Sequence, residues 1–294
     1  MEETSLWTKD IEVDFFKKSL EVASPEKLFY TTEDNKYYAY WPKNYKGKKT
    51  TLQSRNAFIG AYTEKWAQEL LKDTAKEVDA FVVRSIICDE IELSNKSPGD
   101  IAICRKDSRV QKAEDILALF EVKMSIVWNW EYHEDDPNEP FVCLGDYKTH
   151  QGNPGMLRSD SMLKAIGKSI SVRIASLSSA GIPIIILGNT PVTQSYYAKV
   201  DNLKKYGIIQ GFWSLNPSPL DNNGENIKHT PDNGFIRFDS FMEFHESILS
   251  LLKEERTFFA GMKTRKELGE IIAIANREES YEKKAERFLT LMRR

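Results

Sequence analysis

Residues 116–128 read ILALFEVKMSIVW, an apolar run that is interrupted by Glu121 and Lys123. β-branched and aromatic residues at this density predict a strand. Side chains alternate across a strand, so Glu121 and Lys123 share one face. Phe120 and Val122 share the other face. Because charged groups in an apolar strand are costly to bury unless they are paired or bound, this stretch predicts a buried sheet that carries a charged site.

The preceding strand also begins with a charged residue. Ser97-Pro98-Gly99 predicts a tight turn, and the sequence DIAIC, from Asp100 to Cys104, predicts a strand. Short connections favour antiparallel neighbours, so Asp100 and Glu121 are expected on adjacent strands. Each of these charged residues could also have a purely structural role. Asp100 stabilises the turn, and Glu121 forms an ion pair with Lys123 on a solvated face of the sheet.

The same kinds of pattern extend this core along the chain. Apolar residues at helical spacing predict helices over 54–76, 159–179, 240–259 and 264–292. Runs of β-branched and aromatic residues predict further strands over 80–88, 182–187 and 207–215. This order predicts an α/β fold with a mixed central sheet flanked by helices.

The domain organisation follows from the same elements. We expect a single domain over 1–294, with its core at about 54–215. The N-terminal region, 1–53, is polar and aromatic, and we expect it to contact the ligand. The C-terminal portion is predicted to be helical, over 239–293.

Composition excludes several classes of protein. Hydrophobic residues make up 41% and charged residues 29%, the balance of a soluble globular chain. A net charge of -3 argues against a protein that coats nucleic acid through bulk charge. No apolar run is long enough to cross a membrane, and the acidic, polar start does not resemble a signal peptide, so a cytoplasmic location is expected. The cysteines and histidines form no zinc or disulfide pattern.

The charged strands suit phosphodiester hydrolysis. A hard cation such as Mg²⁺ takes oxygen ligands and few protein carboxylates, and Asp100 and Glu121 supply two from adjacent strands. Such a cation polarises a scissile phosphate and lowers the pKa of a bound water. Lys123 is then expected to orient that water and to stabilise the developing negative charge.

At this point the sequence resembles the PD-(D/E)xK nuclease superfamily, the fold of many type II restriction endonucleases. The matching residues are Pro98-Gly99-Asp100 and Glu121-Val122-Lys123. Gly99 is an insertion relative to the plain Pro-Asp dipeptide and leaves the acid in place. The resemblance includes the order of elements from the helix at 54–76 to the strand at 182–187, and therefore covers the middle of the chain.

The resemblance implies specific roles for site residues. Asp100, Glu121 and the carbonyl of Val122 would bind Mg²⁺, and Lys123 would serve the attacking water. The superfamily often places a further catalytic acid on the helix before the sheet. In this chain Glu64 fits that position best, with Glu69 as the competing choice.

The resemblance also implies a function. The chain is expected to be a Mg²⁺-dependent DNA endonuclease, a sequence-specific type II restriction enzyme that cuts double-stranded DNA as a homodimer. A cognate DNA methyltransferase would then protect the host. The alternatives are a repair or structure-specific nuclease of the same fold and a catalytically inactive DNA-binding module.

Basic residues outside the motif are candidates for DNA contacts. They are Lys43, Lys46, Lys48, Lys49, Arg55, Arg158, Lys164 and Lys168. The segment 37–49 interleaves lysines with tyrosines, so a solvated loop with its aromatic residues packed on the core is an equal interpretation. The helix at 159–179 either lies along DNA or forms a dimer interface. Trp128, Trp130 and Tyr132 are expected to extend the catalytic strand, and 131–140 to form a surface loop.

Overall fold

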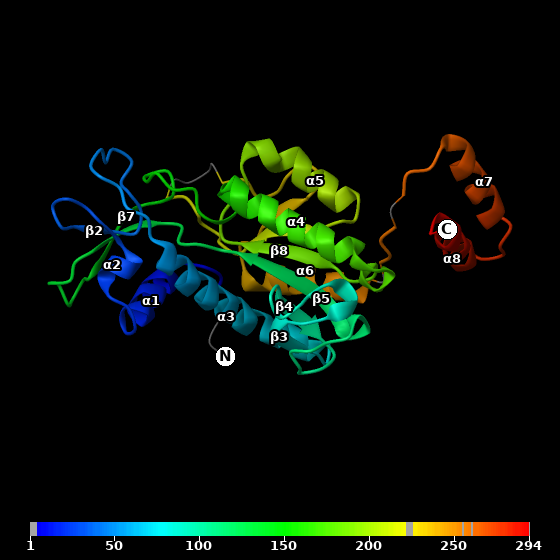
Figure 1. Cartoon of the computed structure of the whole chain (residues 1–294), viewed down its shortest axis with the longest axis horizontal. Helices are drawn as coiled ribbons and strands as arrows, with labels where there is room; N and C mark the ends of the chain where they lie inside the picture. The colour runs from blue at the N-terminus through cyan, green and yellow to red at the C-terminus, as the bar shows by residue number, and fades with distance from the viewer. Residues whose placement is uncertain (1–4, 222–225, 255, 260, 294) are drawn as a thin grey trace. The chain divides into compact units, whose positions relative to one another are not determined.

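A computed structural model describes residues 5–221, 226–254, 256–259 and 261–293, apart from the side chain of Gln53. The chain divides into two compact units, Met1–Glu254 and Glu255–Arg294. The first unit is a mixed α/β structure in which helices flank a mixed sheet (Figure 1). The predicted fold class is therefore confirmed at this coarser level.

The large sheet lies at the centre of the first unit. Its strands, in spatial order, are β10 (Phe235–Arg237), β9 (Gly211–Ser214), β8 (Ile184–Gly188), β5 (Ile116–Lys123), β4 (Gly99–Cys104) and β3 (Phe81–Ile86). The pairs β3–β4 and β4–β5 are antiparallel, whereas β5–β8, β8–β9 and β9–β10 are parallel. The strand β8 is buried along its whole length, as its continuous apolar sequence predicts.

Helices cover both faces of this sheet (Figure 1). The helices of the first unit are α1 (Lys9–Leu20), α2 (Pro25–Leu28), α3 (Gln53–Glu77), α4 (Ser159–Ala175), α5 (Tyr197–Lys205) and α6 (Phe241–Lys253). Phe120 and Val122 belong to the core that also contains buried residues of α1, α3 and α6. The opposite face packs on α4 and α5, through side chains such as Leu119 and Val172. The predicted alternation along β5 is confirmed.

The predicted strand over 116–128 ends early, at Lys123. Trp130 and Tyr132 lie instead in a second, four-stranded sheet, whose strands in spatial order are β1 (Tyr30–Thr31), β2 (Tyr37–Tyr38), β6 (Asn129–Tyr132) and β7 (Phe141–Gly145). Side chains replace the strand partner beyond Lys123: Asn189 Oδ1 accepts from the backbone N–H of Ser125, and a buried acid serves the residues that follow. The carboxylate of Glu12 accepts hydrogen bonds from the backbone N–H groups of Val127 and Trp128, so these groups need no strand partner there.

The N-terminal region contributes to the core. Phe15 and Phe16 of α1 are buried, as are Leu28 and Phe29 near α2. Part of 1–53 therefore serves the core, and the expectation that this region contacts DNA stays a prediction. Residues 1–4 lie outside the described part of the chain.

The predicted helix over 159–179 also ends early. The helix α4 stops at Ala175, because Ser176 is extended and its side chain caps the short 3₁₀ turn Leu177–Ser179. The predicted helix over 240–259 corresponds to α6, which ends at Lys253.

The second unit consists of two helices, α7 (Arg265–Ala275) and α8 (Tyr281–Met292), where the sequence predicts one over 264–292. Ser280 interrupts the pattern because its side chain caps α8. Ile271, Ala275 and Met292 are the buried side chains of these helices. The sequence predicts one domain over 1–294, and the structure divides the chain into two compact units, of which this is the smaller. No helix among the described residues is both long and apolar enough to span a bilayer.

Candidate functional site

Strand register brings the two motif acids together. The antiparallel pairing of β4 with β5 sets Ile101 opposite Phe120, which places Asp100 beside Glu121. The backbone N–H of Val122 donates a 2.8 Å hydrogen bond to Oδ2 of Asp100 and fixes the orientation of that carboxylate. Both acids are mostly buried, with 16% and 11% of their side chains exposed. The carboxylates of Asp100 and Glu121, from neighbouring strands, thus lie next to each other.

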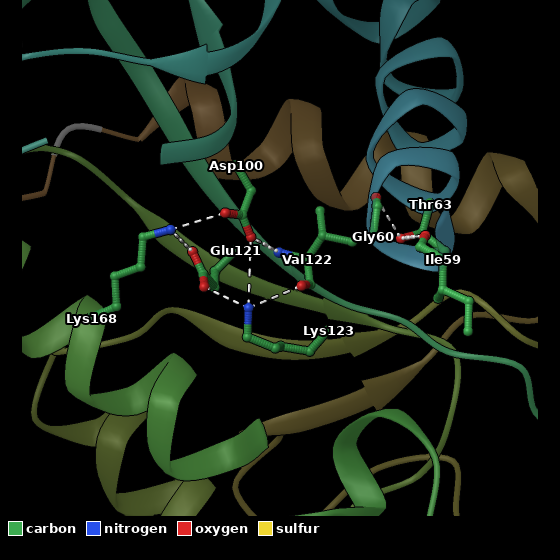
Figure 2. A network of polar contacts seen from close by, with 8 residues as sticks. All are labelled: Ile59, Gly60, Thr63, Asp100, Glu121, Val122, Lys123 and Lys168. Carbon is green, nitrogen blue, oxygen red and sulfur yellow. Dashed lines mark hydrogen bonds and ion pairs between the residues drawn. The ribbon is translucent and has the colours of Figure 1, made fainter. Parts of the chain in front are cut away.

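Three oxygens surround the ammonium group of Lys123 (Figure 2). Its Nζ lies 2.5 Å from Oε1 of Glu121 and 3.0 Å from the carbonyl oxygen of Val122. Oδ2 of Asp100 lies 3.7 Å from the same nitrogen. These are the ligands that the resemblance assigns to Mg²⁺. In this structure a cationic side chain therefore lies among the oxygens expected to hold a metal cation.

A second lysine, Lys168 of α4, completes the cluster. Its Nζ lies 2.9 Å from Oδ1 of Asp100 and 2.6 Å from Oε2 of Glu121 (Figure 2). Lys168 is predicted from the sequence to contact DNA, but the structure places its ammonium group between the two carboxylates. Helical spacing offers a signal for this position, because Ala165 and Val172, three residues before and four after, are buried against the sheet.

Burial and charge act against each other at these carboxylates. Burial raises the pKa of Glu121, and the neighbouring charge of Asp100 raises it further. Burial also opposes ionisation of Asp100, but the charges of Lys123 and Lys168 outweigh it and hold the pKa of Asp100 below its ordinary value. Although burial disfavours the charged ammonium of Lys168, the two carboxylates raise its pKa. The cluster is therefore held together by opposite charges that have little access to water.

The structure distinguishes the two candidate acids on α3. Burial raises the pKa of Glu64, and the charge of Asp100 is the next cause, so Glu64 lies within electrostatic reach of the cluster. Glu69 is exposed and pairs with Lys72 at 2.7 Å. Of the two candidates, Glu64 is therefore the one whose pKa responds to the charge of Asp100.

The oxygens of the cluster suit a hard cation. Among the described residues no group of three or more His, Cys, Asp or Glu side chains is placed to hold a metal ion. Asp100 and Glu121 supply two carboxylates, and the Val122 carbonyl adds a third oxygen. Mg²⁺ commonly binds through one or two carboxylates and keeps several waters. These residues therefore fit Mg²⁺ and do not fit an ion that requires a complete shell of protein ligands.

A cleft of about 740 Å³ opens beside Lys123. Its walls come from β5, the loop before α4, the first turns of α3 and α4, and the segment around Tyr40. Three charged residues line it: Arg55, Lys123 and Arg158. All three are cationic, although Lys123 is paired with Glu121 and Arg158 with Asp160.

The predicted DNA contacts fall into two groups. Lys43, Lys46, Lys48 and Lys49 are exposed, as are Arg158 and Lys164, which both pair with Asp160. Arg55 differs, because only 4% of it is exposed and its guanidinium donates to the carbonyls of Leu28 and Ala39. Its side chain turns inward to two tyrosine rings, so the DNA contact predicted for Arg55 stays a prediction and would have to be made inside the cleft.

No family model matches this chain, and comparison with curated proteins and with solved structures gives no significant match. The site is therefore defined by its own geometry. Two carboxylates from β4 and β5 meet two ammonium groups from β5 and α4, beside a cationic cleft.

Proposed function

We propose that this chain is a Mg²⁺-dependent DNA endonuclease with a restriction-endonuclease-like fold. One observation carries the proposal: Asp100, Glu121 and the Val122 carbonyl place oxygens around a single point, and Lys123 occupies that point. Metal-assisted hydrolysis of a phosphodiester uses oxygen ligands for the cation and a cationic group that stabilises the developing negative charge. A solvated ion pair would not require two buried acids on adjacent strands.

Each residue has a role that follows from its position. Asp100, Glu121 and the Val122 carbonyl would hold the cation, which when bound polarises the phosphate and acidifies a water. Lys123 would then leave the carboxylates and donate to the water or to the phosphate oxygens. Lys168 remains between the carboxylates, where it limits their repulsion. Glu64 would accept a proton or bind a metal-bound water at the edge of the site.

The cationic cleft supports nucleic acid as the substrate. Phosphate groups are attracted to cationic side chains, and Lys123 and the exposed Arg158 both line it. Within this proposal the chain is a type II restriction enzyme that acts on double-stranded DNA as a homodimer, with a cognate methyltransferase protecting the host. A repair or structure-specific nuclease of the same fold would use the same site on a different DNA structure.

Plasmid cleavage tests the proposal. Purified protein with Mg²⁺ should convert plasmid to linear or smaller products, and chelation of the metal should stop the reaction. Lys123→Ala should slow cleavage by more than about a hundredfold, because the group that serves the water is lost. Lys76→Ala, which removes an exposed lysine of α3 that pairs with Asp73, is the matched control. Discrete fragments indicate a site-specific enzyme, a smear indicates a non-specific nuclease, and intact plasmid contradicts the proposal.

One observation favours a second candidate, a catalytically inactive DNA-binding module. The two ammonium groups already balance the two carboxylates, so the cluster is neutral without a metal. In such a module the sole role of the cluster would be to hold α4 against the sheet. Calorimetric titration with Mg²⁺ separates the candidates, because the nuclease should bind the ion and Glu121→Gln should weaken that binding. A module without activity would bind DNA and release no heat with Mg²⁺.

A further inference from the structure

The floor of the cleft contains a buried cation without a carboxylate partner. Arg55 lines the cleft, yet only 4% of the residue is exposed. Its guanidinium lies 5.1 Å from the ring of Tyr30 and 5.0 Å from the ring of Tyr40. Its Nη1 donates to the carbonyls of Leu28 and Ala39, whereas its Nε has no hydrogen-bond partner. Within the described ranges no acid lies within ion-pair distance of the guanidinium. A buried charge in this state is unfavourable unless an anion binds to it.

The first turn of α3 adds a second source of positive potential to the same floor. The helix begins at Gln53, and Leu52 and Asn56 both line the cleft. Leu52 occupies the N-cap position and makes no side-chain hydrogen bond to the helix, and the first turn contains no acid. The free backbone N–H groups of such a terminus bind anions, phosphate above all.

The walls of the cleft supply polar groups but no negative charge. None of its lining residues is an Asp or Glu. The side-chain amides of Asn56 and Asn153 make no hydrogen bond within the part of the chain that the structure describes. Amides of this kind present both donors and acceptors, as the edge of a nucleobase requires. The volume of about 740 Å³ lies in the range of small-molecule sites.

We propose that this cleft binds one unpaired nucleotide through its phosphate group, with Arg55 and the start of α3 as the phosphate site. This deepens the proposed nuclease function and rests on it in taking nucleic acid as the ligand. Because Arg55 is buried, the phosphates on the outside of an intact duplex cannot reach it. A nucleotide that leaves the duplex, or one at a single-stranded end, can enter the cleft and places its neighbouring phosphodiester near Lys123.

The test measures binding in the presence of a chelator, so that hydrolysis and metal binding do not contribute. The probe is a fluorescently labelled thymidine tetranucleotide. It is compared with the same tetranucleotide carrying neutral methylphosphonate linkages, with its 5′-phosphorylated form, and with a blunt duplex. The natural strand should bind at least about tenfold more tightly than the neutral one, because the buried guanidinium requires a charged partner.

Asn56→Asp is the decisive variant. It places a carboxylate in the cleft at an exposed position of the first turn of α3, where an acid stabilises the helix. A loss of binding would therefore not reflect unfolding. We expect affinity for the natural strand to fall about tenfold. Ala57→Asp adds the same charge to the same turn at an exposed residue outside the cleft, and should change affinity by less than about threefold.

Comparison of the other probes identifies which phosphate of the strand binds. Preference for the 5′-phosphorylated strand would assign the site to a terminal phosphate, and equal binding of the two charged strands would assign it to an internal one. Equal binding of the neutral strand, insensitivity to Asn56→Asp, or equally sensitive binding of the duplex would overturn the inference. If the strand binds as expected but plasmid is not cut, the cleft assignment stands and the nuclease proposal fails.

Discussion

At the scale of single residues, the site depends on the balance between two lysines and two carboxylates. Lys123 belongs to the motif itself. Lys168, 45 residues after Lys123 in the chain, comes from α4. Both ammonium groups contact Glu121, each at a different carboxylate oxygen. Removal of either lysine leaves mostly buried negative charge that only one ammonium group balances, so the two substitutions have consequences for stability as well as for catalysis.

Lys168→Met tests this balance directly. In the presence of a chelator the variant should be about 3 kcal/mol less stable than the wild type, because the carboxylates of Asp100 and Glu121 lose one partner. Mg²⁺ should restore part of this loss by replacing the missing charge. The measurement is urea unfolding with chelator and with Mg²⁺.

Lys164→Met is the matched control for that experiment. Lys164 is exposed on the same helix and pairs with Asp160, so its removal should change the free energy of unfolding by less than about 0.5 kcal/mol. If Lys168→Met were as stable as Lys164→Met, the cluster would contribute little to the fold.

At the scale of secondary-structure elements, Glu12 joins α1 to the segment between β5 and β6. Its carboxylate accepts hydrogen bonds from the indole N–H groups of Trp7 and Trp130 and from the backbone at Val127 and Trp128. Despite these donors, complete burial raises the pKa of Glu12 to about 7. One acidic side chain thus holds the segment that links β5 to the second sheet.

The raised pKa of Glu12 predicts a pH-dependent stability. The folded state prefers the protonated acid, so this contribution is fully present below the ordinary pKa of 4.5 and is lost as the pH rises through about 7. Between about pH 5 and about pH 8, the free energy of unfolding of the wild type should fall by about 2 kcal/mol relative to Glu12→Gln. Chemical unfolding of both proteins at the two pH values measures this difference. A difference that does not change with pH would show that Glu12 remains ionised in the fold.

At the scale of the whole molecule, the two compact units each have their own buried residues. In the first unit the core continues from α1 and α3 across the sheet to α6. In the second unit the rings of Phe259 and Phe288 pack edge to face, with their centroids 5.6 Å apart. Ile271 and Met292 of this unit are buried. Since all residues of the candidate site and the cleft belong to the first unit, the second is not needed to form either.

A core substitution in the first unit should therefore leave the second unchanged. Leu71→Ala removes a fully buried side chain of α3 and should destabilise the first unit by about 2–5 kcal/mol. Amide hydrogen exchange should become faster in the sheet while that in α7 and α8 stays as in the wild type. An equal acceleration in both units would contradict their independence.

The sequence alone determined the elements and the motif. Alternation along 116–123 predicted which faces Phe120 and Glu121 occupy, and the turn before Asp100 predicted the adjacent strand; both are local patterns that backbone geometry fixes. The sequence also contains Ser280, the N-cap of α8, but apolar spacing alone predicts an unbroken helix over 264–292.

Only the tertiary structure decided which distant side chains meet. Lys168 joins the carboxylates because α4 packs on one face of the sheet, and Arg55 is buried because the segment around Tyr40 folds over it. The path of the chain between β5 and the second sheet likewise depends on Glu12, more than a hundred residues earlier in the chain. The local sequence around a lysine or arginine does not show whether its side chain is exposed to solvent or buried. Its environment is set by packing between remote segments, which no local pattern contains.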